Sequence, residues 1–165
     1  MSKPDKASSH EPIISKMSIG SHPIHPMLIH FPVAALMGLM ATDIAYVVSQ
    51  DYFWARAGLW LAGVGALGGW VSGVIGLIDL IAVRRIRRLI TAWCHATLAV
   101  MLLSLASLNW LMRADEADAL IWPWGIYISL LTGLLITITS SLGGKLVYER
   151  AVGVDIELAT NDTSR

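Results

Sequence analysis

The sequence has little charge. Only 15% of its 165 residues are Asp, Glu, Lys or Arg, whereas about 25% of a typical soluble domain is charged. A chain this short has a large surface for its volume, and so few charges cannot cover it. Hydrophobic residues make up 55% of the chain and the mean hydropathy is +0.62, which argues against a soluble globular protein and a disordered chain. The 12 basic and 12 acidic residues cancel, so no net field favours a nucleic-acid partner.

Cysteine is nearly absent. Because Cys94 is the only one, an intramolecular disulfide, a CxxC redox pair and a CxxCH site for covalent c-type haem are all excluded. The sequence also lacks an HExxH motif, a Gly-rich phosphate loop and a Ser-His-Asp arrangement. It therefore favours a protein that is not an enzyme by itself. The polar residues 1–16 contain no apolar signal-peptide core, so we expect the first apolar run to be an uncleaved anchor.

Four long runs contain no Asp, Glu, Lys or Arg. They cover residues 17–42, 57–78, 89–112 and 119–144. Each is long enough to cross about 30 Å of hydrocarbon as a helix, which needs roughly 20 residues. The runs show no period of two, so transmembrane strands are disfavoured.

We therefore predict an all-α integral membrane four-helix bundle, with short loops between antiparallel neighbours. The helices are expected at about 27–49, 57–82, 89–111 and 121–145. They form a membrane domain over residues 20–155, between a polar N-terminal tail (1–19) and a mobile C-terminal tail (156–165).

The positive charges predict the orientation of the bundle. Ten Lys and Arg residues fall in the N-terminal tail, in the loop after the second helix and in the C-terminal segment from Lys145 onward, against two, Arg56 and Arg113, on the other side. Cytoplasmic loops carry such an excess, so we expect both termini in the cytoplasm. The loop holds Arg84, Arg85, Arg87 and Arg88. It is a topology signal, and it could also contact anionic lipid headgroups of the bilayer.

Gly65, Gly69 and Gly73 repeat at four-residue spacing in the second helix. Small residues at this spacing let helix backbones approach closely, so we expect tight packing of this helix. The same glycines could instead clear room for a flat cofactor or a pore, or pack against a partner protein. Hydroxyl residues on the fourth helix are expected to bond to backbone or join helices; a polar pathway is the alternative. They are Thr132, Thr137, Thr139, Ser140 and Ser141.

Ionisable groups inside membrane helices are costly, so each is a functional hypothesis. His30, Asp79 and His95 come from three different helices and are predicted roughly 6–9 Å below the same cytoplasmic boundary. His22 and His25 lie at the entry to the first helix, and the nearby prolines could fold His25 back over the mouth of the bundle.

Asp43 lies near the opposite boundary. For it we expect a structural partner, such as Tyr46 or a tryptophan of a neighbouring helix.

Several functions are compatible with this His/Asp cluster. Two imidazoles from facing helices can bind the iron of haem b for electron transfer, and His30 and His95 are the expected pair, with Asp79 accepting a ring N–H. Alternatively, His25, His30, His95 and Asp79 could hold a metal ion, or pass protons. The cluster could also be purely structural, in a non-catalytic subunit or scaffold that packs against a membrane or redox partner.

Several segments resemble a bacterial membrane family catalogued as domain of unknown function 2231. The run His22-Pro-Ile-His25-Pro-Met-Leu-Ile-His30-Phe-Pro is similar to the family's HPxHPxxxxFP pattern. Gly76-Leu-Ile-Asp79, His95 and residues 143–154 match further family positions, although Ala151 stands where the family usually has Gly. That Ala is less free to adopt a positive φ. The resemblance covers about residues 20–155 and implies a four-helix inner-membrane protein, without an established activity.

Overall fold

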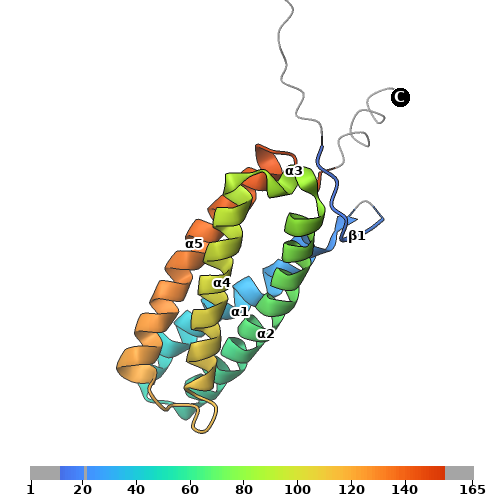
Figure 1. Cartoon of the computed structure of the whole chain (residues 1–165). Helices are drawn as coiled ribbons and strands as arrows, with labels where there is room; N and C mark the ends of the chain where they lie inside the picture. The colour runs from blue at the N-terminus through green and yellow to red at the C-terminus, as the bar shows by residue number, and fades with distance from the viewer. Residues whose placement is uncertain (1–11, 21, 155–165) are drawn as a thin grey trace, which may run out of the picture.

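The computed structural model describes residues 12–20 and 22–154. Four long helices lie side by side as a bundle, and a short fifth helix closes one end (Figure 1). In chain order the elements are β1 Ser18–Ile19, β2 His22–Pro23, α1 Ile24–Ser49, α2 Tyr52–Ala82, α3 Arg84–Arg87, α4 Ile90–Leu111, the π-helix η1 Ile121–Gly125 and α5 Ile126–Tyr148. The Trp122–Pro123 peptide in η1 is cis.

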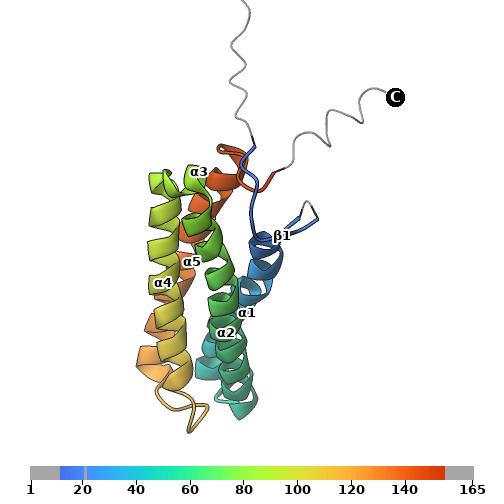
Figure 2. The same cartoon turned by 45° about the vertical axis from the view of Figure 1, so that its right-hand side comes forward.

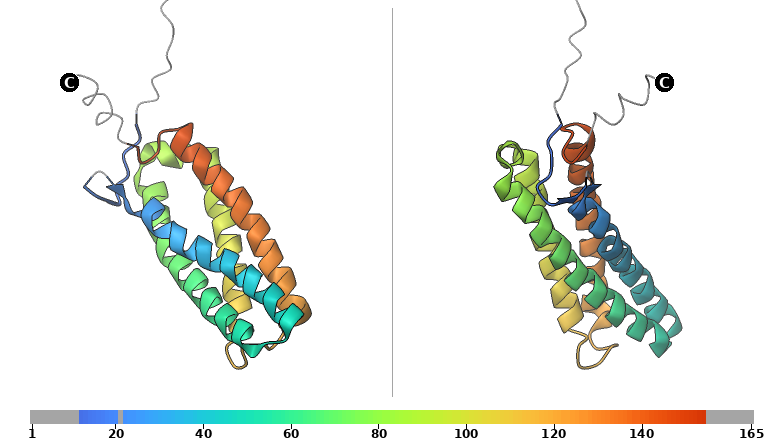
Figure 3. Two further views of the ribbon diagram at one scale, coloured as in Figure 1. Left: turned by 180° about the vertical axis from the view of Figure 1, so that it is seen from behind. Right: turned by 90° about the vertical axis from the view of Figure 1, so that its right-hand side faces the viewer.

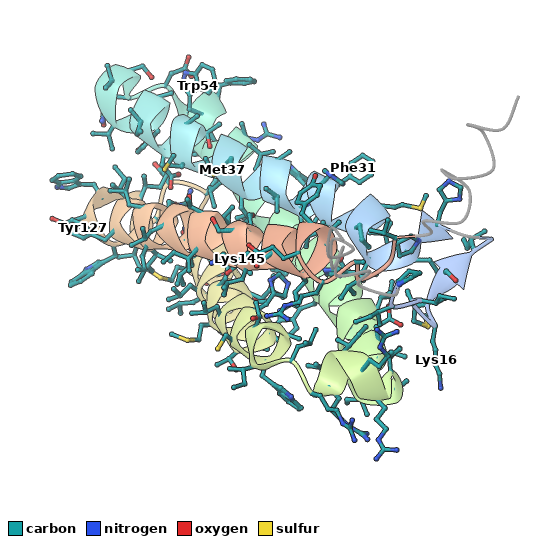
Figure 4. The ribbon with its side chains drawn as sticks, turned by 90° about the horizontal axis from the view of Figure 1, so that it is seen from above. Lys16, Phe31, Met37, Trp54, Tyr127 and Lys145 are labelled. Carbon is teal, nitrogen blue, oxygen red and sulfur yellow. The ribbon has the colours of Figure 1, made fainter. Side chains whose placement is uncertain are left out.

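The four long helices confirm the predicted all-α membrane bundle. By length and composition each can cross a membrane, counting η1 and α5 together as one span. Their lipid-facing surfaces are apolar: Phe31 and Tyr127, 71% and 58% exposed, point outward (Figure 4). Large apolar side chains are exposed along all four long helices, which is typical of a surface that faces lipid.

Two helices begin earlier than their predicted starts at about residues 27 and 57. α1 starts at Ile24 because Pro23 adopts extended dihedral angles (φ −69°, ψ 131°) and stands just before the first turn. α2 starts at Tyr52 because the Asp51 carboxylate caps the Phe53 N–H at 2.9 Å. The left-handed conformation of Gln50 (φ 56°) reverses the chain between them.

The bundle consists of two antiparallel hairpins, α1–α2 and α4–α5, packed face to face (Figures 2 and 3). We call the boundary between them the hairpin interface. A continuous apolar core fills its middle, formed by Leu36, Leu39, Ala62, Ala66, Leu102, Leu103, Ala106, Leu135 and Ile136. Burial of these side chains excludes solvent from the centre of the bundle.

Both described ends of the chain meet beside α3. The Ile13 N–H donates to the Ala151 carbonyl at 2.9 Å, and the Gly153 N–H donates to the Ile13 carbonyl at 2.8 Å. Ala151 takes a positive φ of 51° to make this turn. The two ends therefore lie on one side of the bundle, as an even number of spans requires.

Candidate functional site

Two histidine rings meet across the hairpin interface. His25 lies in the first turn of α1 and His95 in the second turn of α4. Their ring centroids are 6.4 Å apart and the ring planes are perpendicular. Both side chains are half-buried. The sequence thus brings an imidazole from each hairpin to one place.

Each ring is held by the other helix of its own hairpin. The His25 Nδ1–H donates to the Ser72 carbonyl of α2 at 2.8 Å, and the buried Ser72 hydroxyl lies 3.0 Å from the same nitrogen. The His95 Nδ1–H donates to the Thr139 carbonyl of α5 at 2.9 Å. A backbone carbonyl can only accept, so both Nδ1 atoms carry the proton. Each Nε2 therefore keeps a lone pair, and the described residues supply neither with a hydrogen-bond partner.

Two glycines make room for these rings. A Cβ added at Gly76 of α2 would lie 3.1 Å from His25 Nδ1, and one at Gly143 of α5 would lie 3.2 Å from His95 Cε1. Contacts that close would push the rings away from their carbonyl partners. A larger residue at either position would require the neighbouring ring to shift by a few tenths of an ångström.

His30 is not part of this pair. It is exposed on α1, as is His22 in β2, and within the described residues no ring contact joins His30 to His95. The physical reason is the packed face of α1, because the core residues Leu36 and Leu39 lie on the same side of the helix as His25. Five residues turn a helix by about 140° beyond a full turn, so His25 and His30 cannot share a face.

Asp79 binds backbone instead of an imidazole. Its carboxylate accepts hydrogen bonds from the Ser15 hydroxyl and from the backbone N–H groups of Lys16 (2.8 Å) and Met17 (3.1 Å). The group is buried, with 8% of Asp79 exposed. Asp79 thus ties the segment before β1 to the end of α2, close to the end of the bundle that carries the histidine pair.

A second polar site lies at the opposite end of the bundle. The Arg113 guanidinium makes a bidentate ion pair with Asp43, and each side chain is only 1% exposed. Ser129 donates to the same carboxylate at 2.6 Å, and Asn109 accepts from Arg113 Nε at 2.9 Å.

The expected partners of Asp43, Tyr46 or a tryptophan, are therefore not the ones found. Tyr46 instead donates to Asp118 at 3.3 Å. Arg113 had been assigned to the loop. The sequence signal for the ion pair is the position of Arg113 directly after an apolar helix. At that position it lies at the same membrane depth as Asp43, an acidic residue inside another helix.

The hydroxyl groups of α5 fall into two sets. Thr137 and Ser141 donate to carbonyls four residues earlier, as expected, and Ser140 is exposed. Thr132 and Thr139 are 2% and 8% exposed, and neither hydroxyl has a hydrogen-bond partner among the described residues. Leu135 and Ile136 of the apolar core lie between them in the sequence. An apolar layer therefore separates the histidine pair from the Asp43–Arg113 site.

The glycine stripe of α2, Gly65, Gly69 and Gly73, packs against other helices of the same chain. A Cβ at Gly65 would overlap Leu36 of α1, and one at Gly69 would overlap Leu103 of α4. A Cβ at Gly73 would lie 3.4 Å from Leu103, an ordinary contact. These contacts agree with the expected close packing, and a partner protein would have to use another face.

The loop arginines surround one buried apolar residue. Arg84, Arg85, Arg87 and Arg88 are exposed, whereas Ile86 between them is 5% exposed. α3 is therefore an amphipathic turn at the end of the bundle that also carries the histidine pair.

The described residues contain no group of three or more His, Cys, Asp or Glu side chains placed to hold a metal ion. The four apolar helices and their lipid-facing surface define a multi-pass membrane protein. Residues 21–156 match the family described as predicted membrane protein (DUF2231), and the chain belongs to that family. Comparison with curated proteins found no match, and comparison with solved structures found none either.

Proposed function

We propose that this protein binds haem b between His25 and His95 and serves as a small electron-transfer subunit of a bacterial inner membrane. The observation that carries the proposal is the pair of imidazoles, each with its Nδ1–H on a backbone carbonyl. Histidines that bind metals almost always donate their second ring N–H in this way, which fixes the ring and directs Nε2 to the metal. His25 takes the place that the sequence had suggested for His30.

The donor set fits a centre with two protein ligands. His25 and His95 would be the two residues that hold the metal centre, one from each hairpin, with their rings perpendicular to one another. The observed separation of the ring centroids is 6.4 Å. The pair stands alone, since no third metal-binding side chain joins it within the described residues. Two axial imidazoles in an apolar bundle are the ligands that haem b uses.

The residues around the pair have distinct roles. The carbonyls of Ser72 and Thr139 hold the protons on Nδ1, so that both Nε2 atoms can bind a metal. Gly76 and Gly143 leave space for the rings. The apolar core behind the pair excludes water. When bound, haem would supply one-electron exchange at its iron.

A non-catalytic membrane subunit is compatible with the four-span fold and the family, whereas specific features of the structure weigh against a conduit and against docking through the glycine stripe. A conduit for protons or ions needs polar groups along its length, but Leu36, Leu103 and Ile136 belong to an apolar core between the two polar sites. A scaffold that docks through its glycine stripe conflicts with the packing of Gly65 and Gly69 inside the bundle.

The test is an optical spectrum of the purified full chain, from cells supplied with a haem precursor, before and after reduction with dithionite. We expect an α-band that sharpens on reduction and disappears in His95→Ala. Metal analysis of the same sample follows. A folded protein without haem, or a band unchanged in His95→Ala, would overturn the proposal; a bound metal ion without haem would assign the pair to that metal.

A further inference from the structure

The arginines of α3 are not equivalent. Arg85 Nη1 donates to the Pro12 carbonyl at 3.2 Å, and Arg87 Nη1 donates to the Ile81 carbonyl at 3.1 Å. These two side chains tie the turn to the segment before β1 and to the end of α2. Ile86 anchors the turn to the bundle, because its buried side chain packs with Ile13, Leu80 and Ala92.

Arg84 and Arg88 are the two remaining guanidinium groups. Both are exposed, and neither has a hydrogen-bond or ion-pair partner among the described residues. Arg88 keeps helical dihedral angles (φ −83°, ψ −10°), and the two residues are four apart. Side chains at this spacing lie on one side of a helix. The turn thus presents two forked donors, the geometry that suits phosphate oxygens.

An apolar surface adjoins the two arginines. The Trp93 indole N–H donates to the Arg87 carbonyl at 2.9 Å, which fixes the ring while 47% of the residue stays exposed. Ile90, at the start of α4, is 80% exposed, and Ile81, at the end of α2, is 53% exposed. These side chains belong to the lipid-facing surface, and tryptophan is enriched at the level of lipid headgroups.

We propose that Arg84 and Arg88 bind the phosphate of an anionic phospholipid, with Trp93 and Ile90 against its glycerol and acyl region. The apolar flank favours a lipid over a free phosphate ion, because a soluble ion would gain nothing from exposed Ile90 and Trp93. The negative charge of the lipid favours it over a zwitterionic one, because the described residues of the turn carry no acid. This proposal is independent of haem binding.

The experiment measures lipid binding to the purified full chain in detergent. Phosphatidylglycerol, phosphatidylcholine and inorganic phosphate are added separately; bound lipid is counted by native mass spectrometry, and the melting temperature is followed. The variants are R84Q/R88Q and, as a matched control, R56Q, which removes an exposed arginine of α2 at the opposite end of the bundle.

We expect phosphatidylglycerol to bind and stabilise the protein, and R84Q/R88Q to weaken this binding roughly thirtyfold, with R56Q unchanged. High salt should weaken it further. Equal binding of phosphatidylcholine, or equal binding by R84Q/R88Q, would overturn the proposal. Stabilisation by inorganic phosphate alone would replace the lipid with a soluble anion. If R84Q/R88Q does not fold, R84K/R88K keeps the charge without the fork and should bind more weakly than the native chain.

Discussion

At the residue scale, the most demanding interaction is the buried Asp43–Arg113 ion pair. Burial removes both charges from water, and only their bidentate contact and the Ser129 and Asn109 hydrogen bonds compensate for that loss. The arrangement joins α1 to the α4–α5 hairpin. It is therefore a structural clamp in our account, and its disruption should be visible in stability.

We predict that Arg113→Met lowers the free energy of unfolding by about 3–5 kcal/mol, because it leaves the Asp43 carboxylate buried and unpaired. The measurement is unfolding in mixed micelles. The double variant D43N/R113M removes the unpaired carboxylate as well, so its free energy of unfolding should fall less than that of Arg113→Met. A double variant as unstable as the single one would contradict the role of charge.

Ala151 offers a second prediction at this scale. Its φ of 51° is a left-handed conformation, which costs an L-residue about 1–2 kcal/mol. Ala151→Gly relieves this strain but raises the conformational entropy of the unfolded chain. We therefore expect the free energy of unfolding, measured by thermal unfolding, to rise by about 1 kcal/mol. Gly153→Ala, at φ 72° and 3.1 Å from Pro23, should act in the opposite direction. A lower melting temperature for Ala151→Gly would show that the turn is not strained.

At the scale of elements, the glycines of α2 set how closely the helices approach. Gly69→Ala would place a Cβ on Leu103, whereas Gly73→Ala would only reach ordinary contact with the same side chain. We therefore predict that Gly69→Ala destabilises the bundle by about 1–3 kcal/mol, through overpacking. Gly73→Ala is the matched control, and its free energy of unfolding should stay close to that of the native chain in the same assay. Equal effects of the two substitutions would mean that helix contact at Gly69 is looser than described.

The helices could be predicted well from the sequence, and their ends less well. Charge-free runs show where a helix must satisfy its backbone in lipid, so all four spans were found. The ends depend on local caps: after Pro23 and Asp51, α1 and α2 start before residues 27 and 57, where the sequence predicted them.

The candidate site was only partly predictable. Depth along the bundle placed His95 and Asp79 at one end, but depth carries no information on rotation. Which face of α1 points inward is decided by packing: Leu36 and Leu39 lie in the core, and His25 shares their side of the helix whereas His30 does not. Arg113 directly follows α4 at the depth of Asp43, but depth alone does not show that the two side chains face each other.

At the scale of the whole molecule, the described ends and α3 share one end of the bundle, and the α4–η1 loop lies at the other (Figure 1). The excess of Lys and Arg at the first end predicts that it faces the cytoplasm. In a C94S background, we expect D115C in the loop to react with a membrane-impermeant thiol reagent on intact cells, and E149C after α5 to react only after lysis. Labelling of E149C but not D115C on intact cells would show that the bundle has the opposite orientation in the membrane. Both positions are exposed in the structure, so access to the thiol depends on the side of the membrane.

The central claim is that His25, and not His30, pairs with His95 to bind haem. The most direct test compares the reduced-minus-oxidised spectra of His25→Ala and His30→Ala, purified in parallel from cells supplied with haem precursor. We predict that His25→Ala loses the haem α-band and that His30→Ala, which removes an exposed ring, retains it. A band that survives in His25→Ala but disappears in His30→Ala would contradict the account.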